Sequence, residues 1–108
     1  MLGLFERSKA MPMRAAVEKA KGNLDVRLVD VRTPAEYRQG HLPGSISVPL
    51  DQWEQIIQEM VPDKGTLLYV YCLSGARSQA ACRGFGRLGY TEVVNIGGIS
   101  GYDGPLER

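Results

Sequence analysis

The sequence lacks the features that would place it in several large classes of protein. It has two cysteines, Cys72 and Cys82, in 108 residues, whereas a secreted disulfide scaffold of this length would carry more. Its 13 basic and 12 acidic residues nearly cancel, so nothing favours a nucleic acid or a membrane surface as a partner. No apolar run approaches the roughly 18 residues of a membrane span. The apolar stretch at the N-terminus ends at Glu6, which is too short for a signal-peptide core. We therefore expect a cytoplasmic protein.

The sequence does contain an alternation of helical and strand patterns. Its length predicts a single domain over residues 1–108, with a core at about 13–104 and a loose lead-in at 1–12. Helices are expected at Met13–Lys21, Pro34–Arg38, Trp53–Met60 and Ser78–Leu88, and strands at Val26–Val31, Ser45–Val48, Thr66–Cys72 and Glu92–Asn95. Strands that alternate with helices through short turns predict an α/β domain with a mostly parallel sheet.

Local chemistry adds expectations about the ends and faces of these elements. Asp51 is expected to cap the helix that begins at Trp53, whose apolar stripe is expected to pack against the sheet. Gly84 and Gly86 weaken the prediction of the last helix, because each costs about 1 kcal/mol relative to alanine. The segment Ile96–Gly101 is expected to be a glycine-rich turn.

The segment from Cys72 to Ser78 carries the chemistry. It joins the end of the most apolar strand to the start of a helix, where amide groups have no intrahelical partner. These amides and the helix dipole can converge on an anion, so a sulfur at their centre is stabilised as the reactive thiolate. Gly75 supplies a backbone without side-chain bulk, and Arg77 could hold an anionic donor by paired hydrogen bonds.

A thiolate held in this way suits reversible sulfur transfer. Cys72 would attack the outer sulfur of a donor and become a persulfide, from which an acceptor nucleophile would remove the sulfur, giving ping-pong kinetics. This scheme needs no metal and no organic cofactor. The partners are a small-molecule sulfur donor and a thiophilic acceptor, which could be a protein or a thiol.

Four sequence motifs, in order, resemble those of the rhodanese superfamily from about Val26 to Tyr102. They are Leu28–Arg32, the run from Glu36-Tyr37 through Gly40–Gly44 to Ser47–Pro49, the loop Cys72–Ser78, and Gly89-Tyr90 with Gly97-Gly98. The resemblance implies a parallel sheet flanked by helices on both faces and a sulfurtransferase activity. It also implies Cys72 as the sulfur carrier, with Leu73, Ser74, Gly75, Ala76 and Arg77 as its anion cradle. The family often has tryptophan after the double glycine, where Tyr102 stands nearby instead.

Other polar residues are expected to have structural roles. His41 is the one histidine and invites a Cys–His pairing, but it falls in a turn motif and is expected to order residues 40–44. Arg32 is expected to form an ion pair with Asp30 or Glu36 that locks the first strand–helix junction, while a role for Asp30 at the rim of the site stays open.

Several apolar and aromatic residues are assigned to the core. Cys82 lies ten residues beyond Cys72 and is expected to pack in the interior rather than resolve a persulfide as a disulfide. Tyr69 and Tyr71 are expected to be buried on opposite faces of one strand.

Three other functions compete with sulfur transfer. A cysteine phosphatase or arsenate reductase would use the same scaffold, but four residues separate Cys72 from Arg77 where such loops typically have five, and no carboxylate beside the loop is expected to act as general acid. A sulfur-delivery or regulatory binding module would act through a partner. A redox-sensing thiol would form a sulfenic acid or a mixed disulfide at Cys72.

Overall fold

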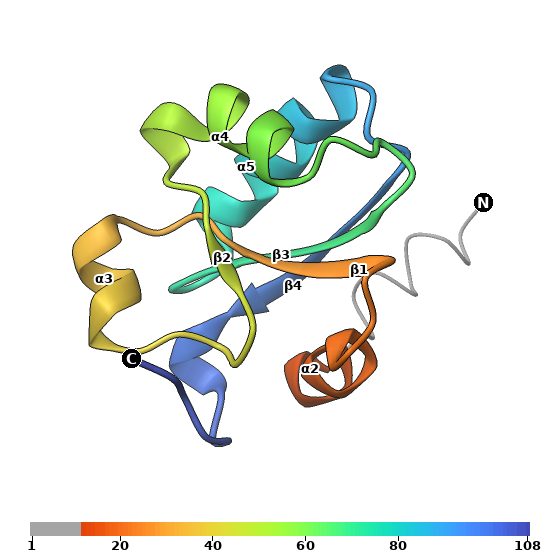
Figure 1. Ribbon diagram of the computed structural model, residues 1–108. Helices are drawn as coiled ribbons and strands as arrows, with labels where there is room; N and C mark the ends of the chain where they lie inside the picture. Colours follow the sequence, from red (N-terminus) through yellow and green to blue (C-terminus); the bar gives the residue numbers. More distant parts are fainter. Residues whose placement is uncertain (1–11) are drawn as a thin grey trace, which may run out of the picture.

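The computed structural model describes residues 12–108 and contains one four-stranded sheet with helices around it (Figure 1). The helices are α2 (Met13–Ala20), α3 (Pro34–Gln39), α4 (Trp53–Met60) and α5 (Ala76–Arg87), with two 3-10 turns, η1 (Leu50–Gln52) and η2 (Ile99–Gly101). The strands are β1 (Val26–Asp30), β2 (Ile46–Ser47), β3 (Leu67–Cys72) and β4 (Glu92–Gly98). All pairings are parallel, as the alternating pattern predicts. Among the described residues, no helix is long and apolar enough to cross a membrane.

The order of the strands in the sheet is β2-β1-β3-β4. The chain moves from β1 to one side to form β2 and from β3 to the other side to form β4, so the order reverses between β1 and β3. In open parallel sheets, ligands bind beyond the carboxyl ends of the strands at such a reversal. Asp30 and Cys72 end these two strands, and Asp30 lies in register with Tyr71.

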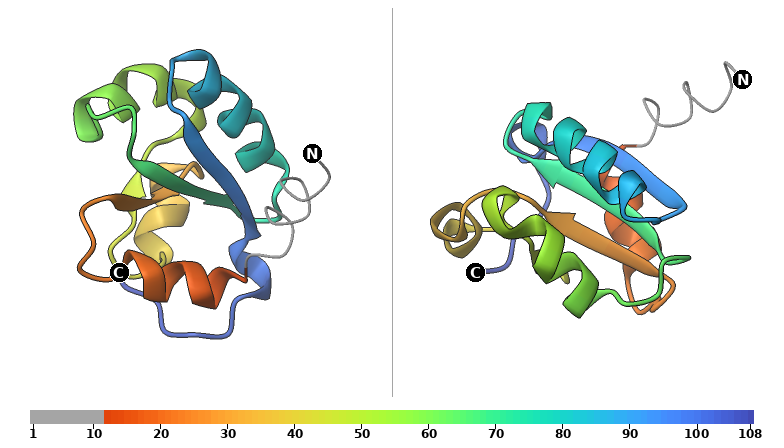
Figure 2. Two further views of the ribbon diagram at one scale, coloured as in Figure 1. Left: turned by 90° about the vertical axis from the view of Figure 1, so that its right-hand side faces the viewer. Right: turned by 90° about the horizontal axis from the view of Figure 1, so that it is seen from above.

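Helices cover both faces of the sheet, as the family resemblance implies. Helices α4 and α5 lie on one face and α2 on the other (Figures 1 and 2). Leu68, Val70 and Cys72 of β3 pack into the first layer, while Tyr69 and Tyr71 both pack into the layer with α2. The expectation that the two tyrosines face opposite sides was wrong, because residues two apart in a strand share a face.

The helical stripe of α4 packs against the sheet as expected, but its start differs. Trp53, Ile56 and Ile57 pack into the core layer between α4, α5 and the sheet, whereas Met60 is 46% exposed. Asp51 does not cap α4. It belongs to η1, and the residue that precedes the helix, Gln52, makes no side-chain capping bond.

Most other boundaries differ from prediction by at most one residue, and two larger differences lie next to Cys72. Helix α5 begins at Ala76 rather than Ser78, because Gly75 adopts a left-handed conformation with φ of 105° and turns the chain directly into the helix. Strand β4 continues through Gly97 and Gly98, where a turn was expected, and Gly98 lies in register with Cys72.

Candidate active site

Cys72 is the last residue of β3, and its sulfur lies inside the turn that leads to α5. The side chain is fully buried. The amide of Gly75 donates a hydrogen bond to Sγ at 3.0 Å and the amide of Ser78 donates one at 3.4 Å. The Ser78 hydroxyl oxygen lies 3.6 Å from Sγ. The amide groups thus face the sulfur, which is the arrangement needed to hold an anion there.

These hydrogen bonds shift the acidity of the thiol. Burial raises the pKa of Cys72, because water no longer solvates the thiolate. The hydroxyl and amide of Ser78, together with the amides of Gly75 and Ser74, lower it further than burial raises it, so the pKa lies below its ordinary value of 9.0. A larger share of Cys72 is therefore the nucleophilic thiolate near neutral pH than in an ordinary cysteine.

Strand β4 and the turn η2 that follows it contact the loop after Cys72. The Leu73 carbonyl accepts a hydrogen bond from the Ser100 amide at 3.1 Å. A side chain at Gly98 would collide with the backbone of Leu73 and Ser74, so a residue with a side chain could not lie at this point of β4 without displacing the loop. Gly98 therefore allows β4 to pass close to the backbone of the loop.

Asn95 joins β4 to the same loop, a role that the sequence pattern did not reveal. Its Oδ1 accepts hydrogen bonds from the Ser78 hydroxyl at 2.8 Å and from the Gly97 amide at 2.9 Å. Its Nδ2 donates to the carbonyl of Gly75 at 3.4 Å. Ser78 lies within the predicted motif, but no role was predicted for its hydroxyl, although a serine in a first helical turn is a recognisable hydrogen-bonding group.

Arg77 does not reach over Cys72 as a free cation. Its NH1 and NH2 groups donate to the two carboxylate oxygens of Glu36 at 2.8 and 3.1 Å. Glu36 also completes the capping box of α3 with Thr33. The hydrogen bond from Arg77, above all, lowers the pKa of Glu36 to about 2.

A carboxylate does lie beside the loop, because α3 brings Glu36 to Arg77. The low pKa keeps this carboxylate ionised at neutral pH, and an ionised carboxylate has no proton to give to a leaving alcohol. Glu36 therefore lies beside the loop but is not a general acid at neutral pH, which argues against a phosphatase mechanism.

The predicted ion pair of the first strand–helix junction forms between Arg32 and Asp30. Arg32 NH2 lies 2.6 Å from Asp30 Oδ2 and 2.7 Å from the carbonyl oxygen of Gly40, and all three residues are buried. The Asp30 carboxylate is thus engaged in the interior and does not lie on an exposed rim. Glu36, the other carboxylate considered for this pair, binds Arg77 instead.

His41 and Cys82 have structural surroundings. The His41 ring stacks on Tyr37 with centroids 3.7 Å apart, and its Nδ1 lies 2.8 Å from the Tyr37 carbonyl oxygen. Its backbone pairs with Glu107. Cys82 is a free thiol against the core, and burial raises its pKa to about 12, so it is not a thiolate near neutral pH.

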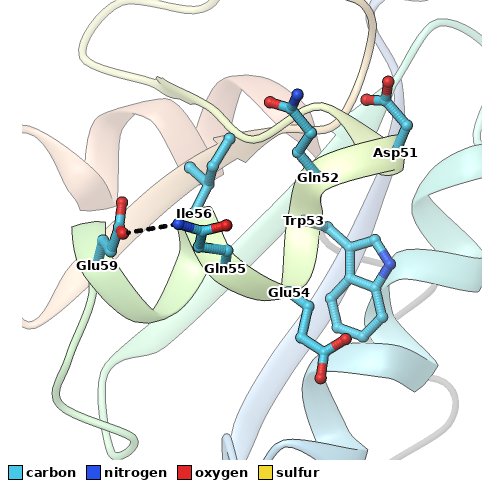
Figure 3. A pocket seen from close by; sticks show the side chains of 7 residues that line it. All are labelled: Asp51, Gln52, Trp53, Glu54, Gln55, Ile56 and Glu59. Carbon is cyan, nitrogen blue, oxygen red and sulfur yellow. Dashed lines mark hydrogen bonds between the residues drawn. The ribbon is translucent and has the colours of Figure 1, made fainter.

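Two hollows lie beside the turn η1, and the lining of one of them contains a residue of the loop after Cys72. This hollow has a volume of about 230 Å³ and is lined by Val31, Thr33, Pro34, Pro49, Leu50, Asp51 and Arg77. The other, of about 430 Å³, runs along η1 and α4 (Figure 3) and has no lining residue from the loop. Within residues 12–108, no group of three histidine, cysteine or acidic residues is placed to hold a metal ion.

The protein is thus an α/β domain with a parallel sheet. Its candidate site is one thiol, held by backbone amides at the carboxyl ends of the strands. The model of the rhodanese-like domain family matches residues 13–104, and the chain belongs to that family. The thiosulfate sulfurtransferase PspE of Escherichia coli strain K12 is 41% identical over 71 residues, which are 66% of this chain and 68% of that protein. A sulfurtransferase of Allochromatium vinosum is 42% identical over 76 residues, 69% of each chain.

The fold agrees with that of solved structures. A rhodanese with anions from E. coli matches with a TM-score of 0.71 and 36% identity, covering 77% of this chain and 98% of that one. An uncharacterized protein from Saccharomyces cerevisiae matches with a TM-score of 0.67 and 30% identity, covering 82% of each chain.

Proposed function

We propose that this protein is a sulfurtransferase that carries sulfane sulfur as a persulfide on Cys72. The donor would be thiosulfate or a persulfide, and the acceptor a thiophilic nucleophile. The observation that carries the proposal is the pair of amide hydrogen bonds from Gly75 and Ser78 to the Cys72 sulfur. They favour the thiolate before the reaction, and such amides can donate hydrogen bonds to the added, negatively charged sulfur after it.

The proposed reaction has two half-reactions. In the first, an electron pair of the Cys72 thiolate forms a bond to the outer sulfur of the donor, and the donor's S–S bond breaks. With thiosulfate, sulfite leaves with the bonding pair and Cys72 becomes a persulfide. In the second, an acceptor nucleophile attacks the outer sulfur of this persulfide, and the Cys72 thiolate leaves. The enzyme returns to its first state, which is the basis of ping-pong kinetics.

The relatives support sulfur transfer as the chemistry. Two of them are named sulfurtransferases, one for thiosulfate, and the E. coli rhodanese contains anions. We propose that residues Leu73 to Arg77 form the anion cradle of this chain, mainly through their backbone. We further propose that residues 1–108 form a single domain with its core at about 13–104. The predicted lead-in at 1–12 lies almost entirely outside the residues that the structure describes. We also propose that the protein acts in the cytoplasm, where both thiols would stay reduced.

The decisive experiment compares the wild type with Cys72→Ser and Cys82→Ser. Each protein is exposed to thiosulfate and to glutathione persulfide, and its mass is measured before and after addition of cyanide. We expect the wild type and Cys82→Ser to gain about 32 Da per sulfur added and to lose it to cyanide. Cys72→Ser should show no gain while keeping its fold by circular dichroism.

Three outcomes would reject the proposal. If Cys72→Ser transferred sulfur at near the wild-type rate, the nucleophile would lie elsewhere. If the wild type gained no sulfur from any donor but hydrolysed an aryl phosphate, the phosphatase alternative would replace it. Gain of oxygen instead of sulfur at Cys72 would favour a redox-sensing thiol.

A further inference from the structure

The positive charge of Arg77, next to the candidate site, is neutralised by a carboxylate from another helix. Of the loop residues 73–77, Arg77 alone is charged, and a guanidinium would ordinarily attract an anionic donor. Here both of its terminal nitrogens donate to Glu36, at 2.8 and 3.1 Å. The pair has no net charge, and the two N–H groups that face Glu36 are not available to a donor anion.

The cavity beside Arg77 is suited to an organic group rather than to a strongly charged one. Its walls include four apolar side chains, those of Val31, Pro34, Pro49 and Leu50. Its polar lining residues are Thr33, Asp51 and Arg77, so the cavity itself contains one carboxylate and one guanidinium. A volume of about 230 Å³ is below the range of pockets for drug-sized ligands, so a group of a few heavy atoms is the size that fits.

We propose that Glu36 is a specificity-determining residue, which by holding Arg77 makes the site prefer a donor with a single negative charge and a small organic group over an inorganic dianion. The inference rests on the proposed sulfur transfer at Cys72. It assigns the donor class as small organic persulfides and thiosulfonates, whose organic group would occupy the cavity between Pro34 and Leu50.

The chemistry allows the two donor classes to be compared directly. Methanethiosulfonate is a monoanion with a methyl group, and thiosulfate is a dianion. In each case the Cys72 thiolate bonds to the outer sulfur, the S–S bond breaks, and the bonding pair leaves on methanesulfinate or on sulfite. Both reactions give the same persulfide, so a difference between them reports the recognition of the donor.

The test is Glu36→Gln, assayed with both donors and cyanide as acceptor. Glutamine at this position keeps the capping box of α3 but removes the charge that neutralises Arg77. We expect the ratio of kcat/KM for thiosulfate to that for methanethiosulfonate to rise about 5- to 20-fold, mainly through a lower KM for thiosulfate. The gain should shrink between roughly 0.05 and 0.5 M salt, because salt screens the freed charge.

Comparing the two donors removes an ambiguity. Freeing Arg77 also changes the electrostatic field at Cys72, and a more or less reactive thiolate would alter both rates alike. The ratio cancels that change. Arg77→Gln, which leaves Glu36 as an unpaired anion, should move the ratio in the opposite direction.

A matched control is Glu59→Gln, which makes the same change in net charge on α4. Glu59 lies in the hollow of Figure 3, where it accepts a hydrogen bond from Gln55, and it does not line the cavity beside Arg77. Its donor ratio should equal that of the wild type.

The outcomes separate this inference from the function on which it rests. Persulfide formation with a ratio that stays within about twofold of the wild type in Glu36→Gln would overturn the role of Glu36 alone. An equal rise in Glu59→Gln would overturn it as well, because the effect would then follow net charge. The absence of a persulfide in the wild type with either donor would overturn the proposed function and this inference together.

Discussion

The Ser78 hydroxyl has one proton and three possible acceptors around it. These are the Gly75 carbonyl at 2.9 Å, Asn95 Oδ1 at 2.8 Å and the Cys72 sulfur at 3.6 Å. While Cys72 is a thiol, its S–H can donate to Ser78, and Ser78 can donate to Asn95 or Gly75. When Cys72 is a thiolate, the hydroxyl can turn toward the sulfur, and Asn95 keeps the oxygen in place during that change.

This geometry predicts that Ser78→Ala raises the pKa of Cys72. A hydrogen bond to a charged group contributes about 1.5–3 kcal/mol, and the 3.6 Å separation puts Ser78 at or below the lower end. The rate of alkylation of Cys72 by iodoacetamide at neutral pH should therefore fall about 3- to 10-fold, with the midpoint of its pH profile moved upward.

Ser74→Ala is the matched control for that measurement. Ser74 is in the same loop and is exposed, and its side chain makes no hydrogen bond within the described part of the chain, whereas its amide acts on Cys72. Its alkylation profile should follow the wild type. Equal profiles for both alanine variants would contradict a role for the Ser78 hydroxyl.

At the level of single residues, the sequence predicted the groups that are local in the chain. Cys72 and the amides of the next six residues could be placed together because a buried strand runs directly into a helix. Asn95 and Glu36 could not, because they lie 17 and 41 residues from their partners Ser78 and Arg77. Their positions depend on how β4 and α3 pack, which no local pattern encodes.

Among the helices, α5 has two glycines with different surroundings. A Cβ at Gly84 would lie 2.7 Å from the Trp53 ring, while a Cβ at Gly86 would meet nothing within 4 Å in the described residues. Gly84 thus allows α4 to approach α5, and Trp53 also contacts the ring of Phe85 edge-on. Of the two glycines that weaken the helix prediction, Gly84 is therefore the one that lets the helices pack.

The pair Gly84→Ala and Gly86→Ala tests this difference in packing. Alanine is the better helix former at both positions by about 1 kcal/mol, but at Gly84 overpacking against Trp53 should cost about 1–3 kcal/mol. We expect Gly86→Ala to raise the free energy of unfolding in urea and Gly84→Ala to lower it. Equal stabilisation of both variants would show that the Trp53 ring moves aside at little cost.

The elements themselves were predicted more accurately than their ends. Apolar patterns located most of the strands and helices, while proline and glycine signals located α3 and β2. The predicted ends of elements were wrong where backbone packing outweighs residue propensity. Glycines 97 and 98 disfavour a strand. Strand β4 nevertheless continues through them, because the loop after Cys72 lies against the backbone of this strand. The start of α5 depends on the left-handed Gly75, which a residue pattern alone does not reveal.

At the scale of the whole molecule, side chains connect the elements that follow β1 and β3, the two strands between which the strand order reverses. Helix α3 follows β1, and helix α5 follows β3. The ion pair between Arg77 and Glu36 therefore joins the first turns of two helices that follow neighbouring strands. The alternating pattern predicted the parallel direction of these strands. It did not predict their order, and hence it could not bring Glu36 and Arg77 together.

This ion pair predicts a particular dependence of stability on pH. The pKa of Glu36 is about 2 in the folded protein and has an ordinary value of 4.5. Because the folded state binds this proton less tightly than the unfolded state, the pair stabilises the fold fully above about pH 4.5 and loses that contribution as the pH falls toward 2. Both side chains are partly exposed, 35% for Arg77 and 27% for Glu36, so the contribution should be about 0.5–1 kcal/mol.

Urea unfolding of the wild type and Glu36→Gln, measured from about pH 6 to about pH 2.5, tests this contribution. The wild type should be the more stable protein at pH 6, and the difference in the free energy of unfolding should shrink steadily as Glu36 takes up its proton. Glu59→Gln should remain parallel to the wild type over the same range. A difference between the wild type and Glu36→Gln that stays constant with pH would contradict this contribution, because the ionised carboxylate would then stabilise the fold no more than its protonated form does.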